Sequence, residues 1–419
     1  DTNKLVFKNI ANGNDFVSYD LANFKNFNQQ TNIIGNFDTR LEFTGSDVHA
    51  LLTLDSSAMK EHAATEIIRT PGEILDGYGP VECNGDPNCI KYTSDVTLSS
   101  NKMGAYSFTL TPELNGDVLE WTLASHKDKA NVEMYGQLPL VGLALVSEGP
   151  EMLNQTMNDI WKSDTEQNTF VNGGYHHTRY ETGSGFDLDS GIVHAGAWKK
   201  FTDDWVLGFF AKYAGGSYET FPIKVNGSAN GFGGGLMSSL RYSETGRLEI
   251  SAEAGYLDME FNSGELLSEF SSTGLYYGAN AGFVETPLQD LNLFANIQWL
   301  RKEKDDITDN LAQKIQFDAM QSLAVRFGAD YTLSSLDLGG LTPSFGLSGI
   351  YEMDGESSVT VEDMTNSDAS LKGLSGRGQV SLAYHNTDTF LPLHTVLTVY
   401  GQVGKREGFG GEVNVSFQF

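Results

Sequence analysis

The chain has 419 residues, 40% of them hydrophobic, and this composition favours a folded protein over a disordered one. Its 27 basic residues face 55 acidic ones, and the formal net charge of -28 disfavours partners such as nucleic acid or anionic lipid headgroups. No apolar run approaches the roughly 18 residues of a membrane-spanning helix, and the start "DTNKLVFKNI" lacks the profile of a signal peptide. The chain should therefore fold in water or enter a membrane as a barrel, and a removed signal or a longer parent chain is compatible with this start.

The 46 glycines, 25 phenylalanines and 17 tyrosines, against only 10 prolines, favour many aromatic-bearing strands joined by tight turns. Residues 1 to about 148 contain short strand candidates such as "KLVF" and "HALLTLD", without a repeat of fixed length. The stretch "YSFTLTPELNGDVLEWTLAS" predicts a hairpin that turns at "LNGD".

The only two cysteines, Cys83 and Cys89, lie in "CNGDPNC", a stretch of turn-forming residues. Their close spacing predicts a small disulfide loop in an oxidising compartment, and the alternative is two free thiols in a loop. A zinc site would need two more ligands, and the nearby His62 and Asp86 form no such pattern.

One amphipathic helix of about three turns is predicted in "GPEMLNQTMNDIWKSD". Leu153, Met157, Ile160 and Trp161 follow at helical spacing, Asn and Asp fill the opposite side, and Pro150 suits a first turn. On periodicity alone, a connector helix on the surface explains the pattern equally well.

From about Phe170 onward, segments of about ten to fourteen residues alternate between apolar and polar residues and then break at turns. In "WVLGFFAKY", "LEISAEAGY", "LNLFANIQW" and "SLAVRFGADY", the apolar row has small or aliphatic residues in its middle and Trp or Tyr at one or both ends. Aromatic girdles around a lipid-facing band have this arrangement. The opposite row would then line an interior, and from it we predict four lumen-facing residues: Arg241, Glu249, Glu253 and Arg326.

Short and long connections alternate along this part of the chain. "TDDW", "ETGR" and "PLQDL" are short, whereas "ETFPIKVNGSAN", "FNSGELLSEFSS", "KEKDDITDNLAQK" and "EMDGESSVTVEDMTNSDAS" are long. We count about twelve strands between residues 168 and 419, an even number as in bacterial outer-membrane barrels. The final strand must pair with the first, because an open edge in hydrocarbon leaves backbone groups unsatisfied. Its apolar row is Val413, Val415, Phe417 and Phe419.

In this order, the parts resemble the C-terminal portion of a classical (type Va) autotransporter of Gram-negative bacteria. "GAYSFTLTPELNGDVLEWTLAS" is similar to the autochaperone segment that ends such passengers, and "NVEMYGQLPLVG" to the exit segment after it. "LNQTMNDIW", with Asn154, is similar to the helix that threads the pore, and "VNVSFQF" to the terminal strand. The resemblance spans roughly residues 90 to 419; no single motif is highly specific, but their order is.

The resemblance implies an all-β fold: a 12-stranded antiparallel transmembrane barrel with a helix in its lumen, preceded by the C-terminal part of a β-helix-like passenger. The implied parts are a passenger stem at 1–148 with an autochaperone-like segment at about 90–135, a pore helix at 149–167, and the barrel at 168–419. The barrel would anchor an adhesin-like passenger in the outer membrane and help export it, with residues 1–148 on the cell surface.

Its implied partners are outer-membrane lipid, periplasmic chaperones, an unidentified surface ligand of the passenger, and the barrel assembly machinery, which would recognise the terminal strand. Members that sever their own helix have two adjacent asparagines where this chain has Glu151 and Met152. We therefore expect the passenger to stay attached.

The sequence offers little catalytic chemistry. It contains no G-x-S-x-G, H-E-x-x-H or Walker-type motif, and Asp187 and Asp189 lack the later ligands of a calcium loop. His176 and His177 are adjacent on one strand and should point to opposite faces. Ser190 and His194 share a face but lie about 13 Å apart along a strand, too far for a nucleophile and its base. We predict no enzyme and no cofactor. The alternatives are a porin or adhesive barrel and, more weakly, a lipid hydrolase that would use Ser190 and His194.

Overall fold

The computed structural model describes residues 102–115, 118–162, 165–336, 338–386 and 393–418, together with seven strands between Lys4 and Leu98. Of those seven strands, and of residues 108–125, 162, 385–386, 393 and 418, it describes the backbone alone. The predicted Cys83 and Cys89 disulfide and the terminal Phe419 lie outside the described residues. The chain divides into two compact units, residues 1–131 with 265–268 and residues 132–264 with 269–419.

The first unit consists of short strands. They are β1 (Lys4–Asn9), β2 (Phe16–Asp20), β3 (Thr31–Gly35), β4 (Thr39–Thr44), β5 (Val48–Leu54), β6 (Thr65–Pro71), β7 (Ser94–Leu98), β8 (Lys102–Met103), β9 (Tyr106–Asn115) and β10 (Val118–Lys127). One sheet has the order β2-β1-β4-β6-β10-β9-β8, and β3, β5 and β7 form a parallel sheet. The hairpin predicted to turn at "LNGD" is present, with Asn115 opposite Val118. The β-helix-like architecture stays a prediction.

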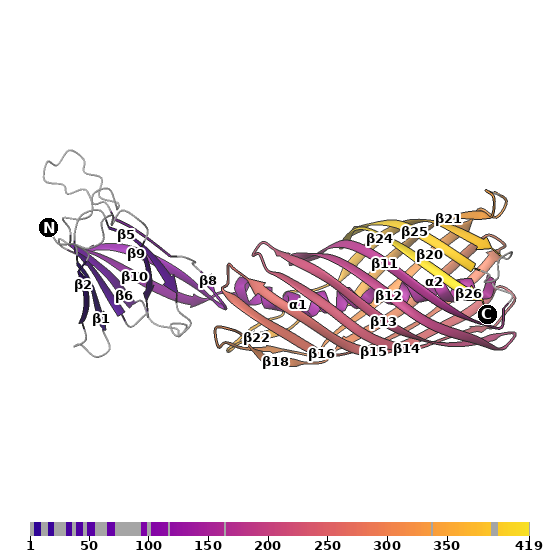
Figure 1. The fold of residues 1–419 in the computed structure, drawn as a ribbon, viewed down its shortest axis with the longest axis horizontal. Coiled ribbons are helices and arrows are strands. Elements are labelled where there is room, and N and C mark those ends of the chain that lie inside the picture. Colours follow the sequence, from indigo (N-terminus) through magenta and orange to yellow (C-terminus); the bar gives the residue numbers. More distant parts are fainter. Residues whose placement is uncertain are drawn as a thin grey trace. The chain divides into compact units, whose positions relative to one another are not determined.

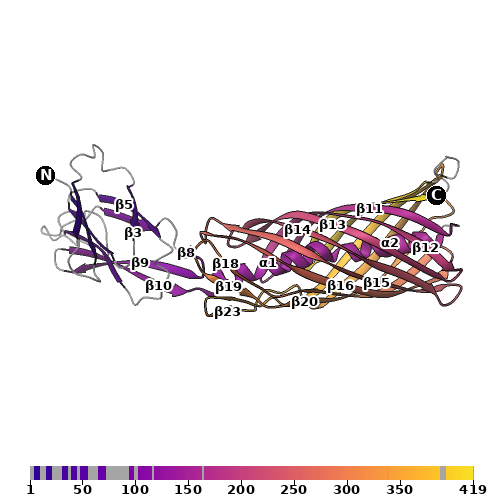
Figure 2. The ribbon, with the colours of Figure 1, turned by 60° about the horizontal axis from the view of Figure 1, so that its bottom comes forward.

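The second unit is a closed barrel of twelve strands in the order β11-β12-β13-β14-β15-β16-β17-β20-β21-β24-β25-β26 (Figures 1 and 2). The bounds of the strands are β11 (Gln167–Thr182), β12 (Ser184–Thr202), β13 (Trp205–Phe221), β14 (Asn226–Arg241), β15 (Gly246–Ser263), β16 (Ser268–Leu288), β17 (Leu291–Lys302), β20 (Met320–Thr332), β21 (Leu341–Asp354), β24 (Gly373–Asn386), β25 (Leu393–Gly404) and β26 (Arg406–Gln418). Antiparallel pairing of β11 with β26, with Val171 opposite Val415, closes the ring. The predicted fold class of a 12-stranded antiparallel barrel is confirmed.

The two-residue period sorts the side chains of each strand between the outside and the lumen. On β13, the side chain of Phe209 is 61% exposed on the outside, whereas that of Lys212 is 4% exposed and points inward. Aromatic rings pair on the outer surface, as Phe201 does with Trp205 at 5.2 Å between centroids and Tyr331 with Phe345 at 5.6 Å. An outer surface of exposed Leu, Ile, Val and aromatic side chains is what hydrocarbon requires of a barrel.

Two helices, α1 (Lys129–Ser147) and α2 (Gly149–Lys162), run inside the ring of strands (Figures 1 and 2). We predicted α2 but missed α1, so the helical segment begins before residue 149. The sequence of α1, "KANVEMYGQLPLVGLALVS", is apolar on all sides from Leu138 to Val146 and contains Pro139. It therefore shows no amphipathic period from which a helix could be predicted. In the described residues no helix combines the length and the apolarity that crossing a bilayer demands.

The connections at one end of the barrel differ from our prediction. β13 continues to Phe221 and β15 to Ser263, so two connections that we predicted to be long consist mostly of strand. The other two long connections carry four short strands that form a sheet of their own. These are β18 (Asp305–Thr308), β19 (Lys314–Phe317), β22 (Val359–Val361) and β23 (Met364–Asn366). Buried Phe317 and Val359 give this sheet an apolar side. We predicted no strands here because most residues of these two loops are polar.

A charge on the outward row tests whether that row faces hydrocarbon. Ile297 is exposed near the middle of β17, and we expect Ile297→Lys to lower the free energy of unfolding in lipid vesicles by about 2–4 kcal/mol. Reversible denaturant unfolding in vesicles measures this loss. Leu338→Lys, an exposed position between β20 and β21, is the control and should change the stability little. An equal effect at both positions would contradict the assignment.

Candidate functional site

The candidate site is the lumen, which the chain's own helices fill. The apolar face of α2 places Leu153, Met157 and Ile160 in a buried cluster with side chains from β11 to β14. The strand members of this cluster are Phe170, Trp198, Val206, Phe210 and Met237. The amphipathic period of α2 thus buries its apolar side against one wall of the barrel.

Trp161, at the end of this apolar face, is held by three strand residues. Its indole Nε1 donates to Ser239 Oγ at 2.8 Å, and the guanidinium of Arg241 lies 4.4 Å from the ring centroid. The ammonium of Lys200 lies 5.9 Å from the same ring. Cations over an indole face are attracted by its negative electrostatic potential, so the end of α2 is fixed between β12 and β14.

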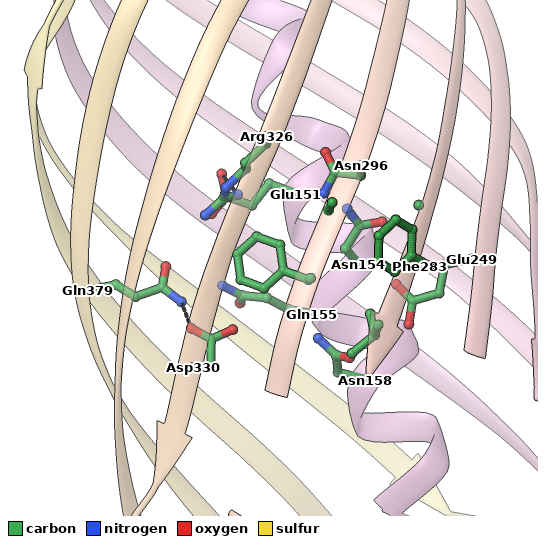
Figure 3. A pocket seen from close by; sticks show the side chains of 14 residues that line it. Glu151, Asn154, Gln155, Asn158, Glu249, Phe283, Asn296, Arg326, Asp330 and Gln379 are labelled. Carbon is green, nitrogen blue, oxygen red and sulfur yellow. Dashed lines mark hydrogen bonds and ion pairs between the residues drawn. The ribbon is translucent and has the colours of Figure 1, made fainter. Parts of the chain in front are cut away.

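The polar face of α2 meets the remaining strands through amides and carboxylates. Asn280 donates to Asn154 Oδ1 at 3.0 Å, Asn414 donates to Asp159 Oδ2 at 2.9 Å, and Arg247 donates to Asn158. A cavity of about 40 Å³ remains on this side of the helix. Figure 3 shows the side chains that line it. Its lining includes Glu249, one of the residues that we predicted to face the lumen.

A turn at Glu148, which we call the bend, joins the two helices. Strand side chains bind the carbonyl groups that the end of α1 leaves free. Lys212 Nζ donates to the carbonyl of Val146 at 2.9 Å, and Gln298 Nε2 donates to that of Ser147 at 2.9 Å. Lys212 also pairs with both carboxylate oxygens of Glu253 at 3.0 Å. The last carbonyls of a helix lack partners within it, so the barrel wall caps α1 here. A Cβ on Gly149 would lie 2.6 Å from Lys212 Nζ, so a larger residue here would displace the ammonium group from its partners.

Three arginines from the opposite wall bind the acidic residues at this bend, and we call Arg326, Arg377 and Arg406 the arginine clamp. Arg377 is the central member: its Nη1 lies 2.7 Å from Glu151 Oε2 and 3.6 Å from Glu148 Oε2. Arg326 also pairs with Glu151, and Arg406 Nη1 lies 3.7 Å from Glu148 Oε1. Both glutamates at the bend, Glu148 and Glu151, are therefore bound to the wall by charge.

The clamp is itself held by acidic residues of the strands. Arg377 Nη2 pairs with Glu412 of β26 at 2.8 Å, and Arg406 Nη2 pairs with Glu352 of β21 at 2.7 Å. The guanidinium of Arg377 lies 3.3 Å from the centroid of the Tyr400 ring. Arginine suits this task because its planar group donates to several partners at once.

α1 fills the other half of the lumen and is almost completely excluded from solvent. The Tyr135 ring stacks on Phe261 at 4.9 Å and on Phe270 at 5.8 Å between centroids. Gly136 lies against the small sheet, where a Cβ would be 3.4 Å from Val359 Cγ1. Thr182 donates to Gln137 Oε1 at 2.6 Å. Both the barrel wall and the small sheet therefore pack on α1.

All four predicted lumen residues point inward and lie near the helices. Glu253 binds Lys212, Arg326 binds Glu151, and Arg241 stacks on Trp161. Glu249 pairs with Arg247 at 2.9 Å. In the predicted assembly signal, Val413, Val415 and Phe417 lie on β26, with Val413 exposed on the outside.

The residues weighed for catalysis do not form a reactive group. His194 Nδ1 is 2.8 Å from Asn172 Oδ1, and within the described residues no hydrogen bond joins His194 to Ser190. Asp189 accepts from His177 at 2.7 Å on the outer surface. His176 is instead buried and bonded to Tyr400. In the described part of the chain, no three acidic, histidine or cysteine side chains converge as metal ligands.

Loss of the central clamp residue should weaken the fold. Arg377→Gln leaves Glu151 and Glu412 buried with one cation fewer, and we expect the free energy of unfolding to fall by about 3–5 kcal/mol. Thermal unfolding of the purified protein in detergent, followed by its heat-dependent mobility in electrophoresis, measures the loss. Arg179→Gln, which breaks the exposed pair with Asp187, should leave the midpoint unchanged. An Arg377→Gln protein as stable as the unchanged chain would show that the clamp does not stabilise the fold.

The family model "Autotransporter beta-domain" matches residues 169–391. Among solved structures, the translocator domain of autotransporter NalP from Neisseria meningitidis is similar, with a TM-score of 0.52 and 10% identity over 65% of this chain and 97% of that one. The transport unit of AIDA-I from Escherichia coli aligns with a TM-score of 0.42 and 12% identity over 65% and 98% of the two chains.

At these identities, the likeness to the NalP domain concerns the fold alone. No curated protein matches the sequence significantly. The match to the family model nevertheless covers more than half of the chain, from β11 to β24. The chain therefore belongs to the autotransporter β-domain family and contains an outer-membrane translocator barrel.

Proposed function

We propose that this chain anchors its own N-terminal segment in the outer membrane, helps to export that segment, and keeps it attached at the cell surface. The observation that carries the proposal is the filled lumen. The two helices α1 and α2 lie inside the ring, and β11 is the next element along the chain. A chain threaded through its own barrel is the expected end state of export through, or together with, that barrel.

The connections between strands support an orientation. The turns between β12 and β13, β14 and β15, and β16 and β17 are short and lie at the α2 end of the barrel. Outer-membrane barrels place their short turns in the periplasm. The mouth where α1 begins would then open to the outside, and the residues before Lys129 would lie on the cell surface. Residues 132–148, which we assigned to the surface stem, belong to the same compact unit as the barrel.

Retention of the passenger is supported by the residues at the bend. Glu151 and Met152 stand where self-cleaving members have two asparagines, and Glu151 is bound by two clamp arginines. The role of the surface segment remains an expectation from the family: an adhesin-like segment with an unidentified ligand. We further propose periplasmic chaperones and the barrel assembly machinery as partners, the latter through the outward row of β26.

An open porin and a lipid hydrolase fit less well. Two helices occupy the lumen that a porin needs for solutes. Ser190 and His194, the pair that a hydrolase would use, bond to different groups, since His194 is held by Asn172.

Protease shaving of intact cells tests the proposal. Protease added outside should remove residues before Lys129 and leave a protected fragment that begins close to that residue, because α1 lies inside the barrel. Mass spectrometry of the fragment gives its start. Permeabilised cells serve as the control for access. Protection of residues 1–128 in intact cells, with digestion after permeabilisation, would place them in the periplasm and refute the export reading.

A further inference from the structure

We propose that α1 and α2 play different parts in closing the barrel: water and small ions enter along one flank of α2 as far as the bend near Glu148, and α1 alone seals the passage. The permeability of the folded barrel follows from this division whether or not the chain exports a passenger. The boundary between the wet part and the sealed part of the lumen lies at this bend.

One flank of α2 is dry. Leu153, Met157 and Ile160 are at most 2% exposed and pack against Phe170 and Phe210 of the wall. Trp161 closes this side at the end of the helix. A closely packed apolar contact of this kind leaves no space for water.

The opposite flank is polar and incompletely filled. The cavity of about 40 Å³ in Figure 3 is lined on the helix side by Glu151, Asn154, Gln155 and Asn158. A second cavity of about 20 Å³ lies beside the bend and is lined by Glu148 and Arg406, among others. Polar cavities of these volumes are large enough to hold water molecules.

Polar atoms without a hydrogen bond line both cavities. Glu151 Oε1 and Gln379 Oε1, at the first cavity, are buried without a hydrogen-bond partner in the protein. Glu148 Oε1, at the second cavity, also accepts no hydrogen bond, and its ion pair with Arg406 is long at 3.7 Å. A buried carboxylate or amide oxygen is costly without a partner, and in a polar cavity water supplies one. These atoms therefore point to water on this flank.

The two cavities meet at one place. Glu151, Asn154, Asn296 and Arg326 line both of them. The ion pair between Glu151 and Arg326 thus stands at the junction and narrows the crevice (Figure 3).

Beyond the bend the lumen becomes apolar. From Leu138 to Val146, α1 contains only apolar residues, each at most 1% exposed among those in the core. A Cβ on Gly142 would lie 2.5 Å from Met259 Sδ and 3.2 Å from Leu257 Cδ1, so helix and wall are in close contact. An ion that entered this contact would lose its water without gaining a partner, which costs several kcal/mol or more.

Single cysteines on the polar flank of α2, on its dry flank and on α1 test whether water enters the crevice. They are placed in a full chain whose Cys83 and Cys89 are changed to Ser. Silver ions are the probe, because they bind thiols and are small enough to follow water. We expect Asn158→Cys to bind silver at least tenfold faster than Met157→Cys, its neighbour on the dry flank, and Leu140→Cys in α1 to stay protected. The mass of the purified protein in lipid vesicles reports the bound silver. Equal rates at 157 and 158, or rapid reaction at 140, would overturn the proposal.

Ion flux through the same vesicles tests the seal. Leu140→Asn introduces a polar group into the α1 contact and should raise potassium flux at least tenfold over the unchanged chain. Gln155→Ala enlarges the crevice without touching α1 and should leave the flux unchanged. Flux through the Gln155→Ala protein would mean that the crevice already crosses the barrel. Should Leu140→Asn fail to fold, as judged by its mobility in electrophoresis, the silver rates decide the question alone.

Discussion

The structure depends on the pairing of β11 with β26. A strand edge in hydrocarbon leaves its N–H and C=O groups without partners, so a sheet in a membrane must close on itself. Closure with twelve strands fixes a lumen, and the two-residue period then gives every strand one row outside and one row inside. Because the outer row faces lipid and must be apolar, specific polar contacts are made by the inner row. The chemistry of this protein is therefore found on that row and on the helices it encloses.

Buried charge at the bend gives the helices a defined position. Arg377 and Glu151 lie in different secondary structure elements, and their pair adds little net stability because both groups lose hydration when they are buried. Removing either partner is costly, however, since the other then stays charged and unpaired. An axial shift of the helices by one turn, about 5.4 Å, would have the same effect on the whole clamp. The clamp and Lys212 thus select one register of the helices within a lumen that would otherwise admit several.

The sequence predicts features with a local period and misses those that depend on distant contacts. The alternation in "WVLGFFAKY" is visible within nine letters, and the apolar spacing from Leu153 to Trp161 is visible within three turns. From Leu138 to Val146, α1 has no such period, because a helical stretch that is buried on every side is apolar on every side and cannot be told from a buried strand. Arg377 binds a residue 226 positions away, and nothing near it in "SGRGQV" marks that contact beyond its place on an inward row.

The apolar half of the lumen shows that the helices belong to the core of the barrel. Leu257 and Met259 of β15 point inward and are fully buried, although an inward row of a water-filled barrel would be polar. Without α1 these side chains would face water, and so would the apolar surface of α1 without the barrel. Each surface completes the other, as two layers do in a globular core. The barrel and its helices therefore form one folding unit, and a helical segment that contributes its own core is held by the same burial that holds the strands.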